Sequence, residues 1–261
     1  MSETPRIFPD HPGIALVTGA STRIGAAIVR ALAQAGHAVV IHYRSGGDDA
    51  ARLADEVRAT GARAVTVQAD LANRDDRARL IAEAAKPFGP LTILINNASV
   101  FDPDSARDVN EELWDRHFAI HAEAPIFLSR DFAGQLTAGV EGNIINMIDE
   151  RVLHPSPAYF SYSLSKSVLW TATQTMAQSL APAIRVNAIG PGPVLPHNGQ
   201  SPEDFEQSLN SLPLKRHAGP EAIAQGVLAI LSMPAFTGQM LALDGGKHLD
   251  YPARRGPTPR K

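Results

Sequence analysis

Thr18-Gly19-Ala20-Ser21-Thr22-Arg23-Ile24-Gly25 is the stretch that decides the fold of this 261-residue chain. It follows a short apolar run at residues 14–17 and leads into a helical pattern at 24–35. Gly19 permits a tight turn, Gly25 lets the helix pack close to the strand, and the helix N-terminus offers free amides to a pyrophosphate. The stretch therefore predicts a strand, a phosphate-binding turn and a helix.

Outward from this unit, short apolar runs alternate with longer helical patterns. The expected strands are apolar on both faces, as parallel strands covered by helices are. They lie at residues 14–17, 38–43, 64–68, 91–96, 143–148, 184–188 and 240–243. The expected helices lie near residues 24–35, 48–59, 74–85, 110–136, 158–180 and 220–231. This alternation predicts an α/β fold, a Rossmann-type doubly wound parallel sheet of about seven strands with helices on both faces.

The composition excludes several classes of protein. A formal net charge of −3 disfavours a surface for nucleic acid or anionic membranes, and the absence of cysteine excludes disulfides and thiolate metal sites. No apolar run approaches the roughly 20 residues that cross a bilayer, and the first residues lack the apolar core of a signal peptide. We expect a soluble cytoplasmic protein with one domain at residues 13–250 and flexible ends at 1–12 and 251–261. No metal site is expected, because metal-ligand spacing is absent from the histidines His42, His117, His154 and His197.

The end of the second expected strand carries Arg44 and Ser45. An NAD site typically places an acidic residue there to hold the ribose 2′-hydroxyl. A guanidinium instead matches a 2′-phosphate, through opposite charge and two parallel hydrogen bonds. The sequence therefore predicts NADPH as the cofactor.

Tyr162 and Lys166 lie one helical turn apart, so their side chains share a face of the expected helix. A nearby cation favours the phenolate and lowers a tyrosine pKa from about 10. We therefore expect Lys166 to lower the pKa of Tyr162, and Tyr162 to exchange a proton with a substrate.

Five motifs stand in one order along the chain. They are Thr18-Gly19 with Gly25, Asp70-Leu71, Asn96-Asn97-Ala98-Ser99, Tyr162 with Lys166, and Pro191-Gly192. In this order they resemble the short-chain dehydrogenase/reductases over about residues 13 to 250. The resemblance implies a nicotinamide cofactor and a homotetramer, with helices 110–136 and 158–180 at the interface. It implies that Asp70 holds the adenine, that Asn97 and Ala98 line the cofactor channel, and that Lys166 holds the nicotinamide ribose. The implied cofactor-binding residues are Thr18, Gly19, Arg23, Ile24, Gly25, Arg44, Ser45, Asp70, Leu71, Asn97, Ala98, Ser99, Tyr162, Lys166, Pro191 and Gly192.

Departures from the family pattern narrow the assignment. Ordinary members have a serine thirteen residues before the tyrosine, where this chain has Asp149, and a glycine where it has Arg23. With Phe101 after Asn97-Ala98-Ser99, and with Tyr159 three residues before Tyr162, the pattern resembles the pteridine reductase branch, which includes dihydromonapterin reductases. His121 stands where the long helix usually has a relay asparagine, and it departs from that branch too.

A pterin substrate would explain these residues. Phe101 could stack one face of a flat bicyclic ring while the nicotinamide stacks the other. Asp149 fits a carbonyl oxyanion poorly, but it can accept from an N–H or act with Tyr162 as a coupled acid. The expected catalytic residues are Asp149, Tyr162 and Lys166, and the expected substrate contacts are Arg23, Ser99, Phe101, Asp149, Tyr159 and Tyr162. Residues 193–215 are expected to form a substrate lid in which either Leu195 or His197 touches the substrate.

Three other interpretations stay open. The chain could be an NADPH-dependent carbonyl reductase that acts on ketones or 3-oxoacyl thioesters. It could be an enoyl reductase, because Tyr159 and Lys166 have the Tyr-x6-Lys spacing of that branch. It could also be an NADPH-binding sensor without turnover, given the altered positions Asp149 and His121.

Overall fold

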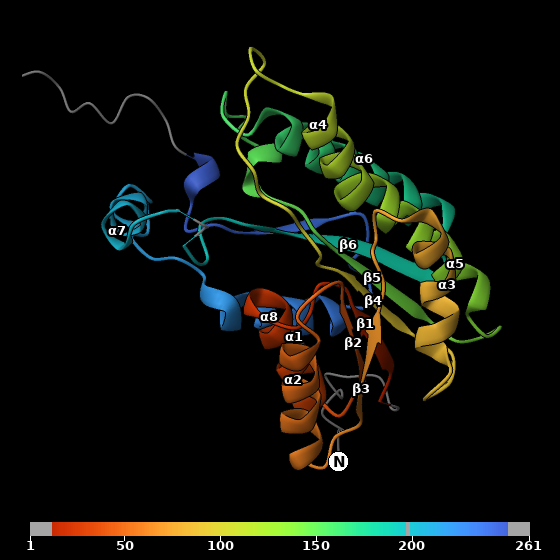
Figure 1. The fold of residues 1–261 in the computed structure, drawn as a ribbon. Helices are drawn as coiled ribbons and strands as arrows, with labels where there is room; N and C mark the ends of the chain where they lie inside the picture. Colours follow the sequence, from red (N-terminus) through yellow and green to blue (C-terminus); the bar gives the residue numbers. More distant parts are fainter. Residues whose placement is uncertain (1–11, 197–198, 250–261) are drawn as a thin grey trace, which may run out of the picture.

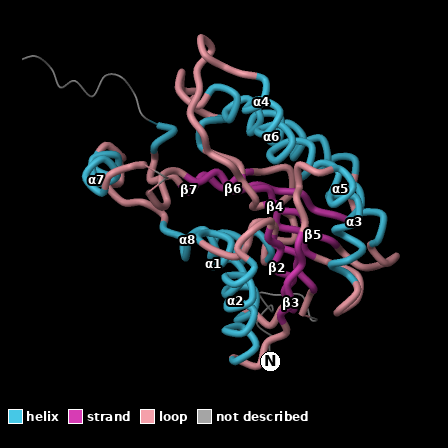
Figure 2. The backbone as a smooth tube through the Cα atoms, in the orientation of Figure 1, coloured by secondary structure: helices cyan, strands magenta, loops and turns pink. Residues whose placement is uncertain are grey.

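Seven parallel strands form one sheet in the computed structural model, which describes residues 12–196 and 199–249 (Figures 1 and 2). Across the sheet the strands are β3 (Ala64–Gln68), β2 (Ala38–Tyr43), β1 (Ile14–Val17), β4 (Ile93–Asn96), β5 (Gly142–Met147), β6 (Ile184–Pro191) and β7 (Met240–Leu243). The order reverses between β1 and β4, which opens a crevice at the carboxyl ends of the strands. The predicted fold class is confirmed.

Helices cover both faces of the sheet (Figure 1). One face carries α1 (Arg23–Gln34), α2 (Gly47–Ala59) and α8 (Gly219–Leu231). The other carries α3 (Arg74–Ala85), α5 (Ala124–Gln135) and α6 (Phe160–Ser179), with α4 (Glu111–Phe118) packed on α6. None of the helices in the described part of the chain combines the length and apolarity that a bilayer crossing requires.

Each strand supplies two cores because its side chains alternate between the faces. In β1, Val17 belongs to the core under α1 and α8, whereas Leu16 belongs to the core under α3, α5 and α6. Phe132 of α5 is fully buried in the second core. Both faces are therefore apolar, and the polar chemistry collects at the strand ends.

Element boundaries differ from the predicted ones at three places near the crevice. β6 continues past 188 to Pro191, because Ile189, Gly190 and Pro191 pair with β7. The helix expected at 110–136 is divided by a π-helical turn at Ala119–Glu123. Residues 193–215 contain a further helix, α7 (Pro202–Asn210), whose first turn is capped by Ser201 Oγ accepting from the Asp204 N–H at 3.0 Å.

The chain ends that are predicted to be flexible lie outside the described ranges, apart from Pro12. His197, which is predicted as a possible substrate contact, also lies outside them.

Candidate active site

Glycine is required at two positions of the turn between β1 and α1. Gly19 has φ 58°, and a Cβ there would lie 2.8 Å from Ala98 Cα. A Cβ on Gly25 would lie 2.5 Å from the Gly19 carbonyl oxygen. Because both contacts are with backbone atoms, any larger residue would push the turn off the end of β4.

Side-chain hydrogen bonds fix this turn to the end of β4. Thr18 Oγ1 accepts from the Asn97 and Ala98 N–H groups at 2.9 and 3.0 Å. Asn97 Nδ2 donates to the Thr18 and Gly19 carbonyls, both at 2.9 Å. Two sequence motifs almost 80 residues apart are thus one rigid unit.

His42 is a site residue that sequence reasoning missed. The Gly19 N–H donates to His42 Nδ1 at 3.0 Å, so the ring must carry its proton on Nε2, which donates to the Ala69 carbonyl at 3.1 Å. Burial lowers the pKa of His42 to about 4, which keeps the ring neutral. His42 therefore ties the ends of β2 and β3 to the phosphate turn. Its position directly before Tyr43 and Arg44, at the carboxyl end of β2, is the signal that could have indicated this role.

A cavity of about 310 Å³ lies over this turn, at the point where the strand order reverses. Nine of the predicted cofactor-binding residues line it: Gly19, Arg23, Ile24, Gly25, Arg44, Leu71, Asn97, Ala98 and Ser99. Thr18, Ser45 and Asp70 are outside this lining. Thr18 is buried beneath the turn, Ser45 is exposed, and the Asp70 carboxylate accepts from the Ala72 N–H at 3.0 Å.

A second cavity of about 410 Å³ shares Arg23, Ile24, Asn97 and Ser99 with the first. It holds all the predicted catalytic and substrate-contacting residues, together with Pro191 and Gly192. The two cavities therefore adjoin each other along the four residues that they share.

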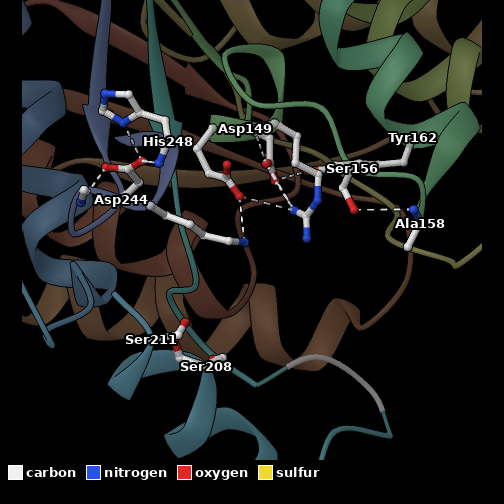
Figure 3. A network of polar contacts seen from close by, with 12 residues as sticks. Asp149, Ser156, Ala158, Tyr162, Ser208, Ser211, Asp244 and His248 are labelled. Atoms are coloured by element: carbon white, nitrogen blue, oxygen red, sulfur yellow. Dashed lines mark hydrogen bonds and ion pairs between the residues drawn. The ribbon is translucent and has the colours of Figure 1, made fainter. Parts of the chain in front are cut away.

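Asp149 and Tyr162 form a hydrogen-bonded pair in the second cavity (Figure 3). Tyr162 Oη donates to Asp149 Oδ2 at 2.9 Å. Arg151 Nη1 donates to both carboxylate oxygens, at 3.1 and 3.2 Å. Asp149 also caps the turn after β5, since Oδ1 accepts from the Arg151 N–H at 2.9 Å. The carboxyl group therefore faces the cavity and holds the phenol in place.

The prediction that Lys166 lowers the pKa of Tyr162 is wrong. Burial and the Asp149 carboxylate raise the pKa of Tyr162 well above its ordinary value of 10. Lys166 Nζ donates to the Met147 carbonyl at 2.8 Å and lies 5.7 Å from the centre of the tyrosine ring. Burial lowers the pKa of Lys166 from 10.5 to about 8. Tyr162 is therefore a phenol that holds its proton at neutral pH.

The aromatic rings of Phe101 and Tyr159 stack at 4.1 Å between centroids and 12° between planes. Tyr159 covers one face of Phe101, so a flat substrate cannot stack on that face. Tyr162 meets the Phe101 ring edge-on at 4.8 Å. Tyr159 is the N-cap of α6 and has a left-handed backbone conformation, with φ 59°, which residues other than glycine rarely adopt.

The loop after β6 closes the second cavity from the side of α7. Leu195 lines the cavity, along with Phe205, Ser208 and Ser211. Arg23 Nη2 donates to the Pro196 carbonyl at 3.0 Å, which connects this loop to the phosphate turn. Leu195, one of the two lid residues left open by the sequence, lies at the cavity. The other, His197, lies outside the described residues.

Sequence reasoning missed two further residues that line the second cavity, Arg151 and Lys247. It also missed Glu150, the ion-pair partner of Lys247. Glu150 is 2% exposed and forms an ion pair with Lys247, Oε1 to Nζ, at 2.7 Å. Burial and the neighbouring Asp149 raise the pKa of Glu150. Lys247 follows Asp244, which accepts from the His248 Nδ1 and N–H groups at 2.6 and 2.7 Å (Figure 3). The usable signal was the charged run Asp149-Glu150-Arg151 directly after a buried strand.

Comparison with known proteins identifies the family. The family model for short chain dehydrogenases matches residues 13–206. The chain belongs to this family. The short-chain dehydrogenases are oxidoreductases, and this membership agrees with the five ordered motifs.

Similar proteins within the short-chain dehydrogenase family include two dihydrofolate reductases and a 3-oxoacyl reductase. A structure of FolM alternative dihydrofolate reductase 1 from Brucella suis in complex with NADP is 44% identical, with a TM-score of 0.89, over 93% of this chain and 96% of that one. Its Brucella canis counterpart, also with NADP, is 43% identical, with a TM-score of 0.87, over 92% and 96%. A 3-oxoacyl-[acyl-carrier-protein] reductase FabG from Staphylococcus epidermidis is 30% identical over 90% of this chain and 98% of its own length. NADP, which both Brucella structures hold, agrees with the predicted cofactor.

Proposed function

We propose that this short-chain dehydrogenase is an NADPH-dependent reductase of pterins, acting on a dihydropterin such as dihydromonapterin, or on dihydrofolate. The observation that carries the proposal is the Asp149 carboxylate, hydrogen-bonded to the Tyr162 hydroxyl at 2.9 Å inside the cavity. Ordinary members have a serine at this position. The similarity to two alternative dihydrofolate reductases supports the same assignment.

A carboxylate beside a protonated phenol suits the reduction of a ring C=N bond. Asp149 can accept a hydrogen bond from an N–H group of the substrate. The serine of ordinary members faces a carbonyl oxygen and has no need to accept such a bond. As the ring carbon gains a hydride, the neighbouring nitrogen gains an electron pair and becomes far more basic than a phenolate. Tyr162 can therefore give that nitrogen its proton although its own pKa is raised.

The residues around the smaller cavity fit NADPH, which supplies the hydride when bound. Gly19 and Gly25 line this cavity without a Cβ, so a phosphate can approach the backbone of the turn closely, and the N-terminus of α1 lies there. Arg44 lies exposed on the cavity wall, where it would pair with the 2′-phosphate. Lys166 lines the adjoining cavity and would hold the nicotinamide ribose.

A steady-state substrate panel tests the proposal. We expect rapid oxidation of NADPH with dihydromonapterin, dihydrobiopterin or dihydrofolate, and slow oxidation with ketones and enoyl thioesters. Turnover of a 3-oxoacyl thioester without turnover of any pterin would instead assign the activity of the Staphylococcus epidermidis relative. NADPH binding without turnover of any of these substrates would make the chain a cofactor-binding protein.

Replacing Arg44 with alanine is expected to raise the KM for NADPH at least tenfold and to leave the KM for NADH nearly unchanged. A hydrogen bond to a charged group contributes about 1.5 to 3 kcal/mol, and only NADPH carries the phosphate that Arg44 would bind. Initial rates with both cofactors measure the effect. Arg44→Lys is the matched control. It should give an intermediate KM for NADPH, because lysine keeps the positive charge but cannot form the two parallel hydrogen bonds of a guanidinium. Equal losses for both cofactors would place the 2′-phosphate elsewhere.

We also propose that the protein is cytoplasmic, that residues 13–250 form one domain, and that four copies assemble through the helices within 110–136 and 158–180. Exposed apolar side chains on α6, Leu164 at 37% and Val168 at 40%, support this assembly. Sedimentation velocity should give the mass of a tetramer. A monomer at micromolar concentration would exclude that assembly.

A further inference from the structure

A π-helical turn at Ala119–Glu123 joins α4 to α5 beside the active site. Such turns are rare, and they often mark functional sites. The turn contains His121, which is fully buried and stands where the family usually has a relay asparagine. The ring lies edge-on to Tyr162, with 5.2 Å between centroids. Neither the fold nor the proposed chemistry requires a histidine at this position.

The proton on the His121 ring can be placed from its neighbours. The Val100 N–H lies 3.1 Å from Nε2 and can only donate, so Nε2 is an acceptor and the proton is on Nδ1. Nδ1 then donates to Ser165 Oγ at 2.9 Å. The Ser165 hydroxyl in turn donates to the Tyr162 carbonyl at 2.7 Å. The Ser99 hydroxyl also lies 3.0 Å from Nε2 and can donate to it.

His121 therefore joins two parts of the site. On one side is the segment Ser99–Val100, where Ser99 lines both cavities and Val100 lines the smaller one. On the other side is the turn of α6 that carries Tyr162 and Lys166. Asparagine is too short for its amide to reach both Ser165 and Val100, whereas the imidazole ring spans the gap.

Proton transfer through His121 is excluded by the same contacts. Both ring nitrogens are engaged, and a second proton on Nε2 would point at the Val100 N–H. The surroundings of His121 also disfavour a second proton on its ring. Burial lowers the pKa of His121 well below 6.5, and the neighbouring Lys166 and His117 lower it further. The ring is neutral across the pH range in which the enzyme would work.

We propose that His121 is a positioning residue, a neutral tether that holds Ser99–Val100 against α6 and so fixes the wall between the cofactor and substrate cavities. The proposed function is assumed for the turnover measurements below but not for the binding measurement. At the position of the relay asparagine, this chain thus has a side chain that serves as a structural link and takes no part in proton transfer through its ring.

Two substitutions separate the two ends of the tether. Glutamine places its terminal amide near the position of Nε2, and asparagine places its amide near that of Nδ1. His121→Gln can keep the contact with Val100, whereas His121→Asn can keep only the contact with Ser165. We expect kcat for a dihydropterin to fall about tenfold in His121→Asn and about threefold in His121→Gln, with the pH profile of kcat unchanged in shape.

His117→Asn is the matched control. His117 lies one turn earlier, is fully buried, and contacts Ser161 Oγ through Nδ1 at 2.7 Å. It should lose thermal stability to a similar extent and keep kcat within about threefold. If His121→Asn does not fold, Ser165→Ala removes one end of the tether alone and should lower kcat about threefold. Where both fold, the effects of His121→Asn and Ser165→Ala should be less than additive.

Fluorescence titration with NADPH provides a readout that needs no substrate. His121→Asn should weaken NADPH binding several-fold more than His117→Asn, even if the wild-type chain reduces no pterin. An unchanged kcat and NADPH affinity in His121→Asn would overturn the tether. The loss of one limb of the pH profile would also overturn it, because that result would make His121 a proton-transfer group.

Discussion

Replacing Asp149 with asparagine is expected to lower kcat/KM for a dihydropterin at least 100-fold. The carboxylate has two functions in the proposed site: it accepts from the substrate N–H, and it orients the Tyr162 hydroxyl at 2.9 Å. An amide keeps the size of the side chain and loses the charge, which also removes the nearer of the two anionic partners of Arg151. A correctly placed proton-transfer group contributes about 10²- to 10⁴-fold to a rate, so the loss should be within this range. Steady-state kinetics with NADPH and dihydromonapterin measure the change.

Two controls make the Asp149 result specific. NADPH affinity, measured by fluorescence titration, should change less than threefold, because Asp149 lies outside the smaller cavity. Asp149→Ser restores the residue of ordinary members and should also be slow with pterins, while any activity on ketones should be kept or increased. If Asp149→Asn reduces dihydropterins at the wild-type rate, the carboxyl group has no part in the reaction and the pterin assignment loses its main support.

The fold could be predicted because its determinants are local. Parallel strands covered on both faces are short runs of apolar residues, and four of the seven strands have the predicted bounds: β1, β2, β3 and β7. Errors arose where tertiary contacts override local pattern. Gly190 and Pro191 usually end a strand, yet they continue β6 because the edge strand β7 pairs with them. The π turn likewise contains His121, whose ring contacts Ser99 and Ser165, two residues that are distant in sequence.

The candidate site could be predicted from the sequence where only one residue type fits a position. Gly19 and Gly25 fit a turn that any larger residue would disrupt, and both line the smaller cavity. The direction of the Tyr162 pKa was not predictable from the spacing of Tyr162 and Lys166. Spacing along a helix places two side chains on one face, but it does not say which other groups reach them. Arg151 and Asp149 approach from the turn after β5, and only the folded chain shows that the Asp149 carboxylate accepts the hydrogen bond of the phenol.

Replacing Lys166 with methionine is expected to abolish more than 99% of turnover without destabilising the fold. Lys166 is 2% exposed, and its burial lowers the pKa of its ammonium group from 10.5 to about 8. At about 1.36 kcal/mol per pKa unit, this shift corresponds to roughly 3 kcal/mol of lost stability at pH 7. The variant also loses the hydrogen bond to the Met147 carbonyl, which contributes about 1.5 to 3 kcal/mol. The free energy of unfolding, measured in urea at pH 7, should therefore equal that of the wild type or exceed it by about 1 kcal/mol.

The stability difference between Lys166→Met and the wild type should depend on pH. Between about pH 8 and 10.5 the unfolded chain keeps a proton on Lys166 that the folded chain has released, so this residue makes the wild type gain stability as pH rises. The advantage of Lys166→Met should therefore be largest at pH 7 and should shrink by about 1 kcal/mol between pH 8 and 9. Lys86→Met is the control: it replaces an exposed lysine at the C-terminal end of α3, and its stability difference from the wild type should show no such change with pH. A Lys166→Met variant that is several kcal/mol less stable than the wild type at pH 7 would mean that the ammonium supports the fold, and the loss of turnover could then not be assigned to chemistry.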